Sequence, residues 1–358
     1  MDSPPPPGGS ADSGAPTPLQ PNDPRSLGRW TLQGRLGAGG MGVVFLGHDA
    51  DRTAAIKVVR PGILDDERIH ERFAREVAVL RRVRDVHISA FLDADLDAEP
   101  AWLAVEYAAG PTLRAEVTDH GPLGPARWWS VAEGLAQALA VLDVHSITHR
   151  DIKPANVILS GAGPVLIDFG IALPEDAASL TGTGLVAGSP SWLSPEQAEL
   201  QPISSASDVF SLGSVLAYAA TGRPPFGAGE TVSVLFAVAG REPDLAGIDA
   251  PRANLLRRML AKRPAARPSA RDLLPIMRAG ATAAAAGETA ETAIIGLGMP
   301  PTPVDGIPMV DSAQPPPTDA PSTGYIAPEH DSGEIAPEPA PKQRSGLWWI
   351  PVIALAVT

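Results

Sequence analysis

Apolar positions alternate around glycines in the first part of the chain. This pattern in residues 27–40, "LGRWTLQGRLGAGG", and 43–60, "VVFLGHDADRTAAIKVVR", predicts strands joined by tight turns. Residues 65–83 follow as an amphipathic helix with an acidic first turn, and residues 88–110 return to short strands. The apolar positions of the helix, at helical spacing, are Ile69, Phe73, Val77 and Leu80.

After Gly110 the pattern becomes mainly helical. Long apolar helices are expected in residues 125–147, 207–222 and 252–264. The prediction is therefore an α+β, two-lobed fold. A small β-rich lobe with one main helix, about 27–108, precedes a larger, mostly α-helical lobe, about 109–280. The cleft between the lobes is the expected site.

Both ends of the chain differ in composition from this folded part. Residues 1–26 are rich in Pro, Gly and Ser and are expected to be disordered, because they contain too little apolar surface to offset chain entropy. Residues 281–345, rich in Pro, Ala and Thr with a repeated "IAPE", predict a flexible linker.

Residues 346–358 are apolar and follow Lys342 and Arg344. As a helix, the continuously apolar residues 347–358 would span only about 18 Å, whereas a bilayer core is about 30 Å thick. We expect the start of a transmembrane helix, with a sticky tail or an interfacial anchor as the alternatives. The positive residues place the upstream part on the cytoplasmic side, anchored to the cell membrane.

Charge and cysteine content exclude several classes of function. The net charge of −13 argues against a general nucleic-acid binder, which needs clustered Lys and Arg. The sequence has no cysteine, which excludes a disulfide framework, a thiolate zinc site and a thiol nucleophile.

"LGAGGMGVVF" contains Gly37, Gly39, Gly42 and Val44 in the spacing G-x-G-x-x-G-x-V. Glycines allow backbone N–H groups to approach phosphate oxygens. A dinucleotide-binding fingerprint looks similar but is followed directly by a helix. The strand-like residues here favour a hairpin that covers phosphates.

Lys57, in "AAIKVV", lies on an apolar strand downstream of this loop. It is either an exposed edge-strand lysine or a lysine that points into the cleft to hold nucleotide phosphates. The second role requires a carboxylate to orient the amine. Glu76 on the following helix, on or beside its inward face, is the candidate, and an exposed helical pair with a neighbouring arginine is the alternative.

"HRDIKPANVIL" and "VLIDFG" bring together Asp151, Lys153, Asn156 and Asp168. Asp151 can orient an attacking hydroxyl and accept its proton, and Lys153 can neutralise a transferred phosphoryl group. Asn156 and Asp168 offer the oxygen ligands that Mg²⁺ prefers. Phosphoryl transfer needs this combination of positioning and charge neutralisation.

In motif order from about Trp30 to Leu274, the sequence resembles a bacterial eukaryotic-like (Hanks-type) serine/threonine protein kinase. The resemblance implies ATP as substrate, with Mg²⁺, or Mn²⁺ as a substitute, held by Asn156 and Asp168. It implies that Asp151 is the catalytic base, that Lys153 contacts the γ-phosphate, and that Lys57 holds the α/β-phosphates and pairs with Glu76. The implied nucleotide-binding set is Leu36, Gly37, Ala38, Gly39, Gly40, Met41, Gly42, Val44, Ala55, Lys57, Glu76, Glu106, Ala108 and Ile158.

Further motifs match the resemblance. Ser194 to Glu196 stand for A-P-E, and the resemblance implies a buried structural pair between Glu196 and Arg267. Asp208 in "SDVFSLG" also matches. Ser189 and Trp192 depart from the common G-T-P-x-Y, but Ser189 retains a hydroxyl that can bond Asp151.

The resemblance also implies regulation through Arg150, which would contact a phosphorylated activation loop. Thr181 and Thr183 are the autophosphorylation candidates, with an ordinary polar loop as the alternative. Implied partners are proteins with Ser or Thr acceptors and a second copy of the chain, since homodimers are common in such kinases. Thr292 lies in a context that phosphothreonine-reading domains can accept.

The expected function is therefore ATP-dependent phosphorylation of proteins in signal transduction. A pseudokinase that acts as a nucleotide-binding scaffold is the main alternative, although such proteins tend to lose the lysine, the base or a metal ligand. A small-molecule kinase is a third reading, which the protein-kinase-like activation segment disfavours.

Overall fold

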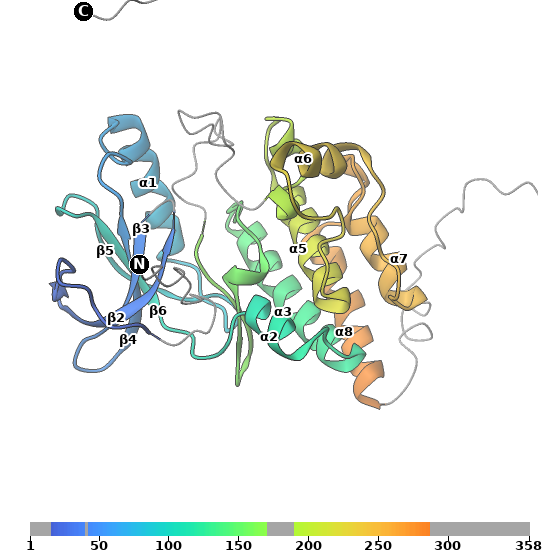
Figure 1. The fold of residues 1–358 in the computed structure, drawn as a ribbon, viewed down its shortest axis with the longest axis horizontal. Coiled ribbons are helices and arrows are strands. Elements are labelled where there is room, and N and C mark those ends of the chain that lie inside the picture. Colours follow the sequence, from blue (N-terminus) through green and yellow to red (C-terminus); the bar gives the residue numbers. More distant parts are fainter. Residues whose placement is uncertain (1–15, 40–41, 170–189, 287–358) are drawn as a thin grey trace, which may run out of the picture. The chain divides into compact units, whose positions relative to one another are not determined.

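The computed structural model describes residues 16–39, 42–169 and 190–286. A small β-rich lobe with one main helix precedes a larger helical lobe (Figure 1). The predicted two-lobed α+β fold is confirmed.

The sheet of the small lobe is antiparallel, with strand order β1-β2-β3-β4-β6-β5. Inward residues of β2, such as Trp30 and Leu32, alternate with exposed ones, which explains why the sequence pattern identified strands. The strand bounds are β1 (Ser26–Leu27), β2 (Trp30–Gly39), β3 (Gly42–His48), β4 (Thr53–Val59), β5 (Phe91–Asp95) and β6 (Trp102–Glu106).

Helix α1 (Glu67–Leu80) begins at Asp66, whose carboxylate accepts a hydrogen bond from Arg68 N at 2.8 Å. Of the predicted apolar positions, Phe73, Val77 and Leu80 are buried, whereas Ile69 is only partly buried. The buried positions join an apolar cluster with the sheet residues Val59, Phe91 and Leu103. The inward face of α1 therefore covers one side of the sheet.

The larger lobe is built around α3 (Pro125–Val144), half of whose residues are buried, and α5 (Ser205–Thr221), most of whose residues are buried. Trp128 Nε1 of α3 donates to Leu216 O of α5 at 2.7 Å, which fixes the two helices together. The α-helices are α2 (Leu113–His120), α3 (Pro125–Val144), α4 (Pro195–Ala198), α5 (Ser205–Thr221), α6 (Thr231–Gly240), α7 (Ala250–Met259) and α8 (Ala270–Ala286). A two-stranded sheet, β7 (Val157–Ser160) with β8 (Gly163–Leu166), and 3-10 turns at Pro154–Asn156, Pro190–Trp192 and Pro264–Ala266 complete the lobe.

The folded part begins earlier than the sequence predicted. Residues 16–26 were expected to be disordered, but Thr17 and Arg35 exchange two backbone hydrogen bonds of 2.8 Å and Leu19 packs against an apolar cluster. Contacts with β2, which lies later in the sequence, stabilise this segment despite its low apolar content. The boundary at residue 26 is therefore wrong.

The folded part also ends later than predicted, because α8 continues to Ala286 where a linker was expected from residue 281. Gly280 packs against the ring of Trp129 on α3, and Ala283 is buried. Small residues, which suggested a linker, serve here for close packing of α8 against α3. Residues 287–358, with the remaining linker, Thr292 and the apolar segment, lie outside the described residues. Within the described residues, no helix is both long enough and apolar enough to cross a membrane.

Candidate active site

A cavity of about 420 Å³ lies between β2, β3 and the segment around β7. Its wall includes every predicted site residue that the structure describes, except Glu76. These lining residues are Leu36, Gly37, Ala38, Gly39, Gly42, Val44, Ala55, Lys57, Glu106, Ala108, Asp151, Lys153, Asn156, Ile158 and Asp168. Gly40, Met41, Thr181 and Thr183 lie outside the described residues.

Asp151 is held in place by its neighbours. Lys153 Nζ donates to Asp151 Oδ2 at 2.6 Å, and Asn156 Nδ2 donates to the same oxygen at 3.0 Å and to Asp151 O at 2.8 Å. The 3-10 turn Pro154–Asn156 creates this proximity, because it folds the chain back within five residues. The carboxylate is thus oriented at the cavity wall, as a group that accepts a proton requires.

The backbone of this segment is strained and firmly supported. Arg150 has φ 67°, in the left-handed region that non-glycine residues rarely adopt. Its N–H donates to Asp208 Oδ1 at 2.9 Å, and its carbonyl accepts from Gln197 Nε2 at 2.9 Å. Such supports are what allow a strained residue to persist beside a functional site.

His149 and Asp208 are buried beneath the cavity. His149 N donates to Asp208 Oδ2 at 2.7 Å, and the His149 ring packs on Phe169 with centroids 4.9 Å apart. Burial lowers the pKa of His149 to about 4 and raises the pKa of Asp208 to about 7. His149 is therefore neutral at physiological pH and serves as packing and support for the cavity floor.

Two ion pairs differ from the predicted arrangement. Lys57 Nζ contacts Asp168 Oδ1, while Glu76 Oε1 accepts from Arg150 NH1 at 3.0 Å and from Arg72 Nε at 3.4 Å. The predicted Lys57–Glu76 pair is thus replaced here by Lys57–Asp168 and Glu76–Arg150. Glu76, which lies on α1, therefore has two arginine partners, Arg150 and Arg72.

The donor set fits a magnesium ion held partly by substrate phosphates. Asp168 offers a partly exposed carboxylate, with φ 56° turning it toward the cavity that it lines, and Asn156 uses only its amide nitrogen in the hydrogen bonds above. Mg²⁺ typically takes one or two protein oxygens and completes its shell with phosphates and water. Within the described residues, no group of three or more His, Cys, Asp or Glu side chains could hold a metal on its own.

Comparison with known proteins identifies the family. The protein kinase domain matches residues 30–276. The chain belongs to the protein kinase family. The kinase is 42% identical over 258 residues to the probable serine/threonine-protein kinase PkwA of Thermomonospora curvata, covering 72% of this chain and 35% of PkwA. It is 41% identical to the serine/threonine-protein kinase AfsK of Streptomyces coelicolor, covering 71% of this chain and 32% of AfsK.

A solved structure gives the same assignment for the fold. The PknI kinase domain of Mycobacterium tuberculosis matches 71% of this kinase and 96% of that domain, with a TM-score of 0.57 and 26% identity. The predicted resemblance to bacterial Hanks-type serine/threonine kinases is confirmed. The kinase spans about a third of the length of the first two curated relatives.

One part of the site carries no signal in the sequence motifs. The kinase cavity is also lined by apolar side chains that were not predicted, namely Leu80, Val83, Ile88, Phe91, Leu103 and Phe169. Ser89 also lines it and donates to Glu106 O at 2.5 Å. The stretch "VHISAFLDAD" contains Ser89, but a serine there gave no signal that it would contact the Glu106 carbonyl.

Proposed function

We propose that this kinase transfers the γ-phosphoryl group of ATP to Ser or Thr hydroxyls of proteins. The observation that carries the proposal is the meeting of Lys57, Asp151, Lys153, Asn156 and Asp168 at one cavity under the glycine-containing strands β2 and β3. This set provides both the positioning and the positive charge that phosphoryl transfer needs.

The proposed reaction assigns one task to each side chain. The substrate hydroxyl oxygen forms a bond to the γ-phosphorus as the bond to the ADP oxygen breaks, and Asp151 receives the hydroxyl proton. Lys153 stabilises charge on the transferred group, and Lys57 holds the α/β-phosphates. Asn156 and Asp168 would hold Mg²⁺, which supplies further neutralisation of phosphate charge.

The adenine would lie between Val44 and Ala55 on one side and Ile158 on the other, because these apolar side chains line the cavity. Glu106 and Ala108 would contact its edge through backbone groups. Ser89 already donates to the Glu106 carbonyl, which retains a second lone pair for the base.

Regulation and location are further parts of the proposal. Autophosphorylation of Thr181 or Thr183 would place a phosphate in reach of Arg150 and serve signal transduction. Protein substrates, a homodimer and a phosphothreonine-reading partner remain the proposed partners. The apolar segment 346–358 behind Lys342 and Arg344 supports attachment to the membrane, with the kinase domain on the cytoplasmic side.

Transfer of labelled phosphate by the full chain to a generic basic protein, with ATP and Mg²⁺, tests the proposal. Asp151→Asn should lower the rate about 10²- to 10⁴-fold, because the base can no longer accept the proton. Asp119→Asn, at an exposed position of α2, is the matched control. Mass spectrometry of the same samples should find phosphate on Thr181 or Thr183.

Retained transfer in Asp151→Asn would contradict the assigned base. Nucleotide binding without any transfer by the unaltered chain would instead favour the scaffold alternative. No structural observation favours that alternative, since each residue of the phosphoryl-transfer set is present at the cavity.

A further inference from the structure

The N-terminal strap, residues 16–25, lies along the edge of β2 that β3 does not occupy. Thr17 N donates to Arg35 O and Arg35 N donates to Thr17 O, both at 2.8 Å. On its other side, Arg35 is in register with Phe45 of β3. At Arg35, β2 is therefore fixed between the strap and β3.

The side chain of Arg35 is held by the same strap. Asp23 accepts from Arg35 Nε at 2.7 Å and from Arg35 NH2 at 2.5 Å, and its own carboxylate is only 5% exposed. Gln20 N donates to Asp23 Oδ2 at 2.7 Å, which closes the turn of the strap around the pair. The hydrogen bonds from Arg35 keep the pKa of Asp23 below its ordinary value. This bidentate, charge-assisted geometry is among the strongest that two side chains can form.

The strap also requires a glycine beneath it. A Cβ at Gly34 would lie 2.7 Å from Thr17 O, closer than real Cβ contacts permit, and 3.0 Å from Pro16 Cβ, tighter than most of them. The strap therefore packs directly against the backbone of β2 at Gly34.

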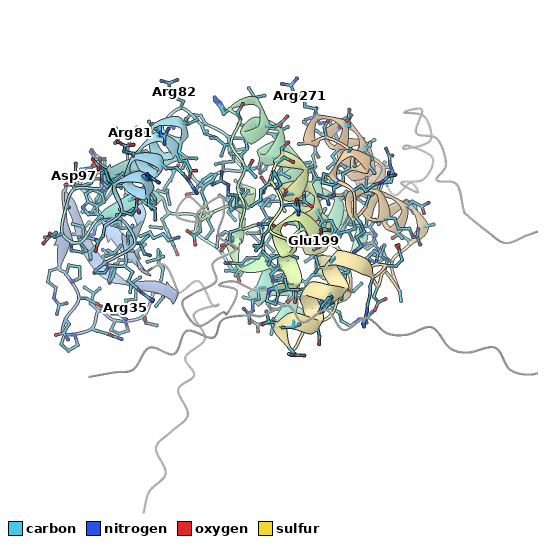
Figure 2. The ribbon with its side chains drawn as sticks, turned by 90° about the horizontal axis from the view of Figure 1, so that it is seen from above. Arg35, Arg81, Arg82, Asp97, Glu199 and Arg271 are labelled. Atoms are coloured by element: carbon cyan, nitrogen blue, oxygen red, sulfur yellow. The ribbon has the colours of Figure 1, made fainter. Side chains whose placement is uncertain are left out.

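This point of attachment lies next to the part of β2 that lines the cavity. The pairing of β2 with β3 shifts register on both sides of Arg35, between Leu32 and Gly34 and again between Arg35 and Gly37. Register shifts loosen a strand, because the extra residue is left unpaired. The residues from Leu36 to Gly39 come directly after and line the cavity. Figure 2 labels Arg35 on the side of the small lobe away from Arg81 and Arg82.

We propose that Asp23 is a positioning residue for nucleotide binding. Asp23 binds Arg35 and thereby fixes the irregular part of β2. This contact would determine how close the glycine-containing hairpin of β2 and β3 lies to the nucleotide phosphates. The inference rests on the proposed function, because it assigns Asp23 a role in binding the ATP of that reaction. Asp23 is absent from the cavity wall, so its effect must pass through Arg35.

Nucleotide affinity in point variants of the full chain tests this inference. Asp23→Asn should raise the dissociation constant of a fluorescent ATP analogue with Mg²⁺, and the KM for ATP, by about 3- to 10-fold. The kcat and the KM for the protein substrate should stay within about twofold, because Asp23 touches neither Asp151 nor the acceptor side. Hydrogen exchange at Leu36–Leu46 should become faster in the same variant.

Gly34→Ala provides an independent second variant. It keeps Asp23 and Arg35 but displaces the strap from β2, so the same rise in the dissociation constant is expected. Asp51→Asn is the matched control, because Asp51 is exposed in the turn between β3 and β4. Nucleotide affinity should be unchanged in Asp51→Asn.

A lower melting temperature in Asp23→Asn and Gly34→Ala with unchanged nucleotide affinity would overturn the inference, because the strap would then be merely structural. Since affinity is measured without phosphate transfer, the outcome is separable from the proposed function. An unaltered chain that binds the analogue but transfers nothing would contradict the proposed function, and the variants would still decide the role of Asp23.

Discussion

Two glutamate–arginine pairs of this kinase, Glu196–Arg267 in the larger lobe and Glu76–Arg150 between α1 and the segment that carries Asp151, differ in burial and in supporting bonds. The side chains of Arg267 and Glu196 are 0% and 5% exposed, and those of Arg150 and Glu76 are 14% and 28% exposed. The Glu196–Arg267 pair is buried from solvent, whereas the Glu76–Arg150 pair is partly exposed to solvent.

The buried pair is fully satisfied. Arg267 donates to both carboxylate oxygens of Glu196, at 2.6 and 2.9 Å, and Ser207 Oγ adds a third bond at 2.6 Å. The remaining N–H groups of Arg267 donate to backbone carbonyls of Ala206, Ala261 and Lys262. With every donor occupied, this pair has one arrangement.

The half-buried pair has alternatives. Glu76 Oε1 is shared between Arg150 at 3.0 Å and Arg72 at 3.4 Å, and Lys57, the partner that the family resemblance implies, lies on Asp168. The contrast indicates that Glu196–Arg267 is a fixed support for α4 of the larger lobe. Glu76–Arg150 is instead a contact of α1 whose partner can change.

The largest effect should come from Arg267→Ala. It leaves the Glu196 carboxylate buried without its cation, so the free energy of unfolding should fall by about 3–5 kcal/mol. Urea denaturation of the variant and the unaltered chain measures the difference. Arg223→Ala is the matched control, because Arg223 and Asp244 form a pair that is 59% and 57% exposed, and such pairs contribute about 0–1 kcal/mol. An equal loss of unfolding free energy in Arg267→Ala and Arg223→Ala would contradict a special role for the buried pair.

The stability contributed by the Glu196–Arg267 pair should depend on pH. Burial raises the pKa of Glu196, but hydrogen bonds from Arg267 and Ser207 outweigh it and hold the pKa below the usual 4.5. A carboxyl with a lowered folded-state pKa stabilises the fold above its unfolded pKa and loses that contribution as the pH falls through the folded value. The stability gap between the unaltered chain and Arg267→Ala should thus be largest near neutral pH and narrow below pH 4.5. Urea titrations of both proteins at several pH values measure this gap, and a constant gap would contradict the assignment.

The sequence predicted most of the fold because its local patterns are strong. Alternation in β2 to β4 and the stripe of Phe73, Val77 and Leu80 in α1 are signals carried by neighbouring residues. The N-terminal strap gave no such signal, since Asp23 is held by Arg35, which is 12 residues away. Long-range contacts of this kind are invisible to a local pattern.

The motif residues of the candidate site were predictable from the sequence, but the apolar part of the cavity and the ion pairs were not. The motif residues line one cavity because β2, β3, β7 and the turn Pro154–Asn156 are each set by local sequence. The partner of Glu76 depends instead on where α1 lies relative to Arg150. Motif spacing does not encode that position.

The smallest expected effect is the coupling between Glu76 and Arg150 themselves. In a double-mutant cycle with Glu76→Gln and Arg150→Met, the interaction energy in urea unfolding should be only about 0.3–1 kcal/mol, because the pair is partly exposed and Arg72 can substitute. Phosphate transfer should respond more strongly than stability in Glu76→Gln, since the family arrangement needs this carboxylate beside Lys57 for activity. A coupling above about 3 kcal/mol would place this pair with Glu196–Arg267 as a fixed support. A small coupling with a reduced transfer rate would instead identify Glu76 as a carboxylate whose partner changes between the resting and the active arrangement.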